Sequence, residues 1–233
     1  MRTLFLIVLI GIISVLSFLT WEGSRVWKDS MALWDNVIKK YPNIPKAYAS
    51  RGEAYSELGQ YDQAILDYTK ALEINPKYSE AYYNRGNAYG KNDQFDQAIL
   101  DYIKALEIKP KYAEAYYNRG NAYGKKEQLD QAILDYTKAL EINPDYVEAY
   151  TNRGSVYYVK RKYEQAISDF NEALKINPNY SLAYFNKALA LEGIGRIRDA
   201  VEAYQRFLEN APPQYTKQIH HARKRIKALY LID

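Results

Sequence analysis

The chain has 233 residues, of which 48% are hydrophobic and 26% charged, a balance typical of folded rather than disordered proteins. It contains no cysteine, which excludes disulfides, thiol nucleophiles and cysteine metal sites. The formal net charge of +4 is confined to one end, because residues 215–233 hold five basic residues and one acidic residue. No nucleic-acid partner is therefore expected for the chain as a whole.

Residues 3–21, TLFLIVLIGIISVLSFLTW, carry no charge. As a helix they would extend about 28 Å, close to the hydrocarbon thickness of a bilayer. This predicts a transmembrane anchor over residues 1–22 and a single-pass membrane protein whose repeat part lies outside the cytoplasm. The alternative is a cleaved signal peptide, since Met1 and Arg2 form a short basic start. The bulky residues of SFLTWEG at its exit argue against cleavage.

From residue 45 a unit of 34 residues recurs five times, and AYYNRGNAYGK occurs at both 81–91 and 115–125. Positions 4, 8 and 11 of each unit fall on one helical stripe, and positions 20, 24 and 27 on another. A proline at position 32 separates successive units. Each unit is therefore predicted to be a helix–turn–helix hairpin. The units are 45–78, 79–112, 113–146, 147–180 and 181–214.

The first four units carry tyrosine at position 4, glycine at 8, tyrosine at 11, alanine at 20, an aromatic residue at 24, alanine at 27 and proline at 32. The fifth unit departs from this pattern at positions 8, 11 and 27, with Ala188, Leu191 and Phe207, as expected near the end of an array. This pattern resembles the tetratricopeptide repeat over residues 45–214. The resemblance implies an all-α fold, a right-handed α-solenoid of helix hairpins whose first helices line a concave groove. In the same register, residues 23–44 are interpreted as a lone second helix, a half-repeat. Residues 215–233 are interpreted as a basic capping helix.

Arginine recurs at position 7 and aspartate at position 23 in the first four units. In an antiparallel hairpin these two positions face each other. We predict four structural ion pairs: Arg51 with Asp67, Arg85 with Asp101, Arg119 with Asp135, and Arg153 with Asp169. In the fifth unit both positions change together, to Lys187 and Ala203. The alternative is a row of ligand-binding arginines.

Asparagine recurs at position 6, and in two units also at position 9, outside the core stripe. In the tetratricopeptide repeat family, positions 2, 5, 6, 9, 12 and 13 line the groove. The column at position 6 resembles the asparagine ladder of the O-linked N-acetylglucosamine transferase superhelix, which holds a peptide main chain. An amide suits that role because it both donates and accepts hydrogen bonds. The candidate peptide-binding residues are Asn84, Asn87, Asn118, Asn121, Asn152, Asn186, Tyr83 and Tyr117. Alternatively, these amides are only solvated.

Two features near the C-terminal end each allow two interpretations. The groove positions Leu182, Phe185 and Leu189 of the fifth unit are apolar. They provide either a hydrophobic anchor for a partner or packing beneath the closing helix. The basic stretch HHARKRIK, residues 220–227, is interpreted as the solvated face of that helix, with nucleic acid or anionic lipid as alternative partners.

No nucleophile–base pair, phosphate-binding loop or paired-acid arrangement is present, so neither catalysis nor a cofactor or metal is expected. The leading interpretation is a membrane-anchored scaffold that binds a protein or an extended peptide in the groove. A second interpretation rests on about the first 50 residues. They resemble the C-terminal end of polytopic membrane glycosyltransferases that carry tetratricopeptide repeats. The catalytic part would then lie outside this chain.

Overall fold

The computed structural model describes residues 31–229, and all regular structure within that range is α-helical. Residues 31–40 form a first helix. The helices that follow are α2 (Pro45–Glu57), α3 (Tyr61–Ile74), α4 (Ser79–Lys91), α5 (Phe95–Ile108), α6 (Ala113–Lys125), α7 (Leu129–Ile142), α8 (Val147–Val159), α9 (Tyr163–Ile176), α10 (Ser181–Gly193), α11 (Ile197–Asn210) and α12 (Thr216–Leu229).

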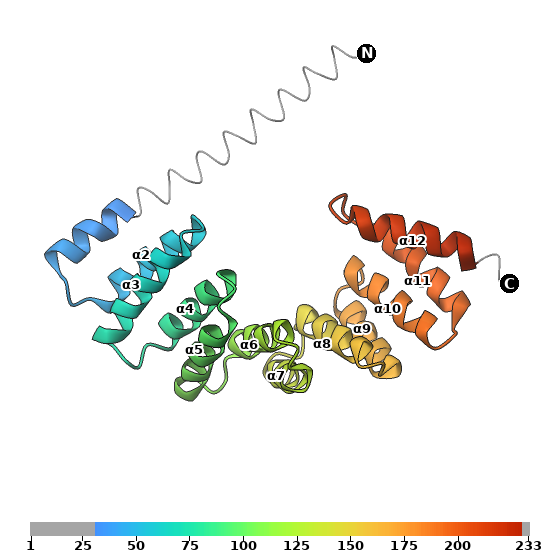
Figure 1. The fold of residues 1–233 in the computed structure, drawn as a ribbon, viewed down its shortest axis with the longest axis horizontal. Coiled ribbons are helices and arrows are strands. Elements are labelled where there is room, and N and C mark those ends of the chain that lie inside the picture. Colours follow the sequence, from blue (N-terminus) through green and yellow to red (C-terminus); the bar gives the residue numbers. More distant parts are fainter. Residues whose placement is uncertain (1–30, 230–233) are drawn as a thin grey trace, which may run out of the picture. The chain divides into compact units, whose positions relative to one another are not determined.

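Consecutive helices pack as hairpins: α2 with α3, α4 with α5, α6 with α7, α8 with α9, and α10 with α11 (Figure 1). Neighbouring hairpins also pack through α3 and α4, α7 and α8, and α9 and α10. This consecutive packing is typical of an α-solenoid built from repeats. The predicted all-α fold class is confirmed for the described residues.

A residue in the left-handed region reverses the chain at position 15 of every repeat. These residues have φ between 56° and 75°. Glycine adopts this conformation at no steric cost, whereas other residues adopt it rarely. They are Gly59, Asp93, Glu127, Arg161 and Gly195. A fixed turn geometry therefore recurs in all five hairpins, although the residue that provides it changes.

Small residues at positions 8 and 20 bring the two helices of a hairpin close together. A Cβ atom on Gly120 would lie 2.8 Å from the ring of Tyr136, and one on Gly154 would lie 2.7 Å from the ring of Phe170. Both rings are buried. The glycine thus leaves the space in which the aromatic residue at position 24 packs against the first helix.

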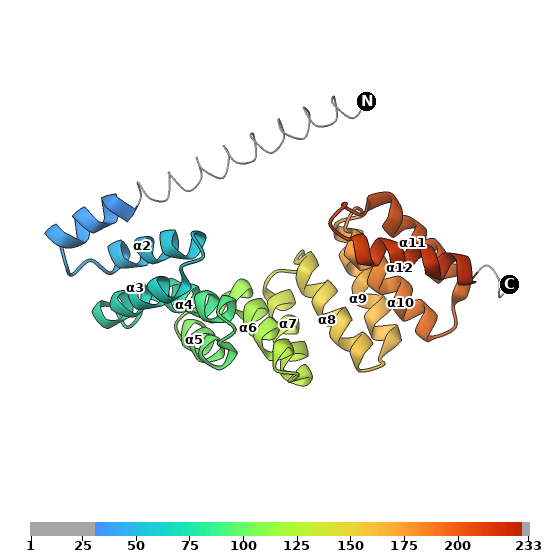
Figure 2. The ribbon, with the colours of Figure 1, turned by 45° about the horizontal axis from the view of Figure 1, so that its top comes forward.

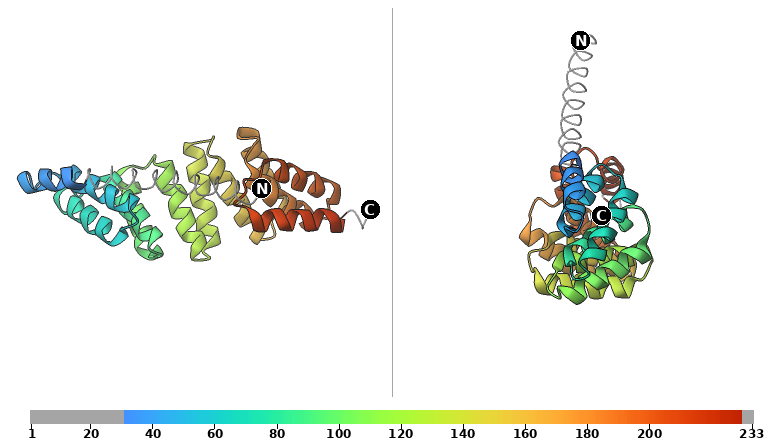
Figure 3. Two further views of the ribbon diagram at one scale, coloured as in Figure 1. Left: turned by 90° about the horizontal axis from the view of Figure 1, so that it is seen from above. Right: turned by 90° about the vertical axis from the view of Figure 1, so that its left-hand side faces the viewer.

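The described chain divides into an N-terminal body, residues 31–110, and a C-terminal body, residues 111–229. In the N-terminal body, Ile38 of the first helix packs against the core that contains Tyr48 and Tyr68. In the C-terminal body, α12 packs along α11 (Figures 2 and 3). Its residues Ala222 and Leu229 belong to the same core as Phe207. Each body therefore has its own core.

No helix within residues 31–229 is long and apolar enough to cross a bilayer. Helices α2 to α12 have 13 or 14 residues each, whereas a span needs roughly 20 apolar residues. The prediction of a single-pass membrane protein with an extracytoplasmic repeat part is therefore wrong for the described part of the chain. The predicted anchor, residues 1–22, lies outside the described residues.

Candidate functional site

The four arginines at position 7 each bind the aspartate that faces them across the hairpin. In every pair, Nε and Nη2 donate to the two carboxylate oxygens over 2.6–2.8 Å. The aspartates are only 5–6% exposed. Such two-pronged contacts are the strongest geometry for an arginine–carboxylate pair. The arginine side chains are thus held by the fold itself.

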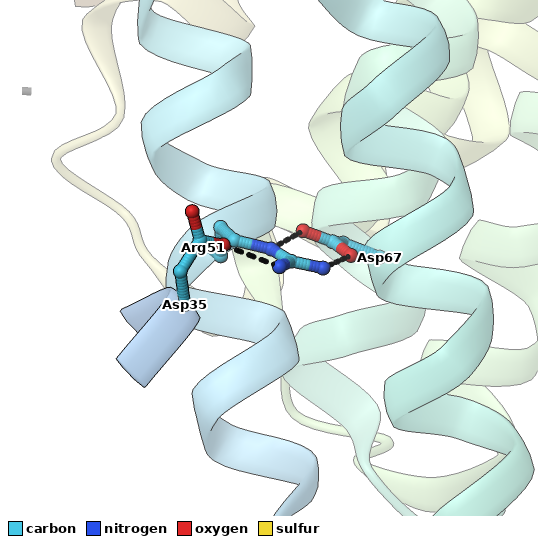
Figure 4. Close-up of polar contacts among 3 residues, drawn as sticks. All are labelled: Asp35, Arg51 and Asp67. Carbon is cyan, nitrogen blue, oxygen red and sulfur yellow. Dashed lines mark hydrogen bonds and ion pairs between the residues drawn. The ribbon is translucent and has the colours of Figure 1, made fainter. Parts of the chain in front are cut away.

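Three of these arginines also donate a hydrogen bond from Nη1 to a helix that precedes their own hairpin. Arg85 donates to Thr69 over 2.9 Å, and Arg153 donates to Thr137 over 2.8 Å. Figure 4 shows Arg51 between Asp67 and Asp35, the latter on the first helix at 2.6 Å. The acceptor stands at position 25 of the preceding repeat in each case. Sequence reasoning missed this contact, although the hydroxyl or carboxylate in that column was a visible signal.

Burial and pairing act in opposite directions on the pKa values of these groups. Burial raises the pKa of the Asp101 carboxyl, and the hydrogen bonds from Arg85 only partly counteract it. Asp135 and Asp169 behave in the same way. Burial is also the largest single effect on Arg85 and opposes its charge, but the hydrogen bond to Asp101 and the charge of that carboxylate together raise the pKa of the guanidinium. Because each arginine forms an ion pair with the aspartate that faces it, the structure favours structural ion pairs over a row of ligand-binding arginines.

The asparagines at position 9 are bonded across their own hairpin. The hydroxyl of Tyr102 donates to Asn87 Oδ1, and that of Tyr136 donates to Asn121 Oδ1, both over 2.8 Å. In the fourth repeat, Phe170 has no hydroxyl and position 9 is Ser155. The pairing is specific to the second and third repeats, because the first and fifth have Tyr68 and Tyr204 at position 24 but Glu53 and Leu189 at position 9.

The asparagines at position 6 of the C-terminal body link successive repeats. Asn152 Nδ2 donates to Asn121 Oδ1 over 2.9 Å and to the hydroxyl of Tyr117 over 3.0 Å. Asn186 Nδ2 donates to Ser155 Oγ over 3.1 Å. Asn118 and Tyr83 also have interactions within the protein. The N–H groups of Asn152 and Asn186 are thus used within the fold, whereas the carbonyl oxygens of these two side chains can still accept hydrogen bonds.

Asn84 differs from the other position-6 amides because it makes no hydrogen bond within residues 31–229. It lines a hollow of about 380 Å³ in the N-terminal body, between α2 and α4. Ser56 Oγ, also in the lining, is buried and has no hydrogen-bond partner there. The full lining is Glu53, Ser56, Glu57, Tyr61, Tyr68, Asn84, Asn87, Ala88 and Lys91. Many of these residues stand at positions 6, 9, 12 or 13, which the family resemblance assigns to the groove.

The hollow combines unpaired polar atoms with charged residues of both signs. Glu53 and Glu57 line it from α2, and Lys91 lines it from α4. Burial raises the pKa of Tyr68 to about 12, so its hydroxyl keeps its proton at neutral pH. The site can therefore donate and accept hydrogen bonds and place both signs of charge against a bound chain.

Family models match along most of the described chain. A tetratricopeptide repeat model matches residues 79–112, 113–146 and 147–180. A TPR repeat model matches residues 52–93, and a further tetratricopeptide repeat model matches 33–66 and 170–202. The chain belongs to the tetratricopeptide repeat family. The three central matches have the same bounds as the second, third and fourth predicted repeats.

Solved structures of other tetratricopeptide repeat proteins share this fold. The chain is 30% identical to MamA, with a TM-score of 0.66 over 68% of this chain and 93% of that chain. YrrB, described as "a TPR protein with an unusual peptide-binding site", is 22% identical, with a TM-score of 0.69 over 82% and 97%. The C-terminal part of a TPR repeat-containing protein from Cytophaga hutchinsonii is 23% identical, with a TM-score of 0.75 over 88% and 83%. The last two likenesses show the fold alone.

No protein with a curated description matched this tetratricopeptide repeat chain. The resemblance of its first 50 residues to membrane glycosyltransferases received no support from the comparisons.

In the fifth tetratricopeptide repeat, the apolar residues pack beneath the closing helix. The ring of Phe185 lies 5.1 Å from that of Phe207 and 5.7 Å from that of His221 on α12. Leu189 packs against the same core. For these two residues the structure favours packing over a hydrophobic anchor for a partner.

The closing helix is also held by a partly buried polar contact. Glu192 accepts hydrogen bonds from the hydroxyl of Tyr204 over 2.6 Å and from Arg225 Nε over 2.9 Å. Burial opposes the negative charge of Glu192, but the hydrogen bonds from Arg225 and Tyr204 outweigh it and lower its pKa. Arg225 belongs to the basic stretch 220–227, so part of that stretch serves the fold, while Arg223, Lys224 and Lys227 remain exposed.

Proposed function

We propose that this tetratricopeptide repeat protein is a scaffold that binds an extended segment of a partner protein in the hollow between α2 and α4. The tetratricopeptide repeat fold suits protein–protein interaction, and proteins of this family are generally non-catalytic scaffolds. Stacked helix hairpins present extended surfaces that are well suited to partners. The specific site is inferred from the side chains that line the hollow.

The unpaired amide of Asn84 is the observation that carries the proposal. Its counterparts Asn152 and Asn186 have amide donors that are used within the fold. Asn84 has no such bond within residues 31–229 and lines the hollow. One amide can accept from the N–H and donate to the C=O of a peptide group, so it can hold a main chain without reading its sequence.

The charged residues of the hollow define the partner further. Glu53 and Glu57 favour a basic side chain near α2, and Lys91 favours an acidic side chain near α4. The buried Ser56 hydroxyl can gain a hydrogen bond from a bound chain that it lacks within the fold. The preferred ligand is therefore an extended peptide with a basic and an acidic residue a short distance apart.

In the C-terminal body the same function would use the atoms that internal bonding leaves available. These are the carbonyl oxygens of Asn152 and Asn186. Tyr117, which accepts from Asn152, adds an aromatic face beside them. This surface is the weaker candidate because each of its amides already has a partner.

Selection of peptides on the full chain tests the proposal. Peptides are selected from a random twelve-residue display library, and their dissociation constants are then measured for the parent, Asn84→Ala and Gln97→Ala. Gln97 is an exposed amide on α5 outside the hollow and serves as the matched control. We expect Asn84→Ala to weaken binding about tenfold, which corresponds to roughly 1.4 kcal/mol, and Gln97→Ala to leave it unchanged.

Hydrogen exchange with the bound peptide locates the site independently. Protection is expected for amides near the hollow, in α2 and α4. If no peptide is enriched, or if the enriched peptides bind the Asn84→Ala variant as tightly as the parent, the proposal is wrong.

A further inference from the structure

The fifth repeat keeps a cation at position 7 but lacks the carboxylate that pairs with it elsewhere. Position 7 is Lys187 and position 23 is Ala203, whereas the first four repeats have arginine and aspartate. Lys187 and Ala203 line a hollow of about 180 Å³ in the C-terminal body. The full lining is Ile167, Asn171, Tyr184, Lys187, Leu191, Arg196, Asp199, Glu202, Ala203 and Arg206.

Among the cations that line this hollow, Lys187 is partly buried and has no ion-pair partner within the described residues. It makes no hydrogen bond or ion pair within residues 31–229. The other two cations are paired: Arg196 with Asp199, and Arg206 with Glu209 over 3.2 Å. Glu202 is exposed, and its carboxylate forms no ion pair with Lys187. Burial lowers the pKa of Lys187, and the charges of Glu202 and Asp199 only partly counteract this effect.

The other four hairpins place a carboxylate beside the cation at position 7. In each of them the aspartate at position 23 places a carboxylate 2.6–2.8 Å from the position-7 guanidinium. The methyl group of Ala203 does not extend to that place. Because Arg196 and Arg206 each have a carboxylate partner, an anion in this hollow is favoured at the Lys187 ammonium.

We propose that this hollow binds a carboxylate from outside the chain. The oxygens of this carboxylate form an ion pair with the Lys187 ammonium and occupy the space that the position-23 aspartate fills in the other repeats. The carboxylate is either the side chain of an acidic residue on a partner protein or a small free carboxylic acid. The site lies in the C-terminal body and does not depend on the Asn84 hollow.

Nuclear magnetic resonance of the full chain with labelled lysine side chains tests the site. Acetate is the first probe, and sodium chloride keeps the ionic strength constant. We expect a saturable shift of the Lys187 signal with half-saturation in the millimolar range, about 10–100 mM. We also expect the pKa of Lys187 to rise with bound acetate. The signal is assigned by its loss in Lys187→Gln.

The matched variant is Ala203→Asp, which restores the internal carboxylate. It should raise the pKa of Lys187 without acetate and remove the response to acetate. Lys187→Gln provides a second test that does not require a new charge to be accommodated. Its folding is checked by circular dichroism, and its remaining lysine signals should show no saturable response.

Two further probes separate the sources of the carboxylate. They are a capped glycine–glutamate–glycine tripeptide and its glutamine counterpart. Binding of the glutamate peptide at least tenfold tighter than that of acetate assigns the site to an acidic side chain of a partner. Binding of acetate as tight as that of the peptide assigns it to a small acid. The proposal is overturned if no probe shifts Lys187 more than chloride does, or if Ala203→Asp responds as the parent does.

Discussion

Asn152 donates a hydrogen bond of 2.9 Å from its side-chain amide to the carbonyl oxygen of Asn121, one repeat earlier in the chain. The same amide group donates to the hydroxyl of Tyr117 over 3.0 Å. Because Tyr136 also donates to Asn121, four side chains from three helices form one network. An amide column that resembles a ligand-binding ladder therefore also joins α6, α7 and α8.

We expect Asn152→Ala to lower the free energy of unfolding by about 2 kcal/mol, because it removes the donor to the Tyr117 hydroxyl and one of the two donors to Asn121 Oδ1. Urea denaturation followed by circular dichroism measures the change. Gln165→Ala, at an exposed amide of α9, should change it by less than about 0.5 kcal/mol. Equal effects of the two substitutions would contradict the linking role.

The ion pair of Arg119 and Asp135 should behave as a coupled unit. Asp135 is 5% exposed, so removing Arg119 leaves a buried carboxylate without a counter-charge. Arg119→Ala and Asp135→Ala should each cost roughly 3 kcal/mol. The double variant should cost less than their sum by about 1–3 kcal/mol. A double-mutant cycle by urea denaturation measures this coupling, and additive effects would remove the inferred pairing.

The close contact of the hairpin helices predicts opposite effects for two glycines of α6. A Cβ on Gly120 would lie 2.8 Å from the ring of buried Tyr136, so Gly120→Ala should destabilise the protein by about 1–3 kcal/mol. At Gly124 the nearest atom lies 3.9 Å away, at the Tyr136 hydroxyl. Gly124→Ala should therefore stabilise by up to about 1 kcal/mol through helix propensity. Thermal unfolding distinguishes these signs, and a neutral Gly120→Ala would refute tight packing.

Acid should loosen the closing helix α12. The pKa of Glu192 is lower in the folded protein than its ordinary value of 4.5. Its contribution to stability is therefore present above about pH 4.5 and is lost as the pH falls through the folded pKa. Amide hydrogen exchange in α12, corrected for its intrinsic pH dependence, should show less protection at pH 3 than at pH 6.

The variant Glu192→Gln isolates this group from the other carboxylates of the body. Its α12 should be less protected than that of the parent at pH 6, and the difference should shrink at pH 3. A difference that is the same at both pH values would show that the charge of Glu192 does not hold α12.

Several features of this protein follow from the sequence by itself. The period of 34 residues and its two apolar stripes predict helix hairpins, because an amphipathic helix must bury its apolar face against another element. The facing of Arg153 and Asp169 follows from antiparallel geometry, in which the sum of two facing positions is constant. These inferences need only local periodicity and chain direction.

Other features depend on distances that exist only once the helices have packed. The left-handed residue at position 15 is glycine in two repeats and another residue in three, so composition does not reveal it. From the sequence, Phe185 could contact either a partner or the closing helix. In the structure its ring centroid lies 5.7 Å from that of His221 on α12. The partner of an asparagine is decided in the same way. An amide suits a tyrosine hydroxyl, a neighbouring amide, water or a peptide equally well. Asn152 is bonded and Asn84 is not because packing brings Tyr117 and Asn121 to the former and leaves a hollow beside the latter.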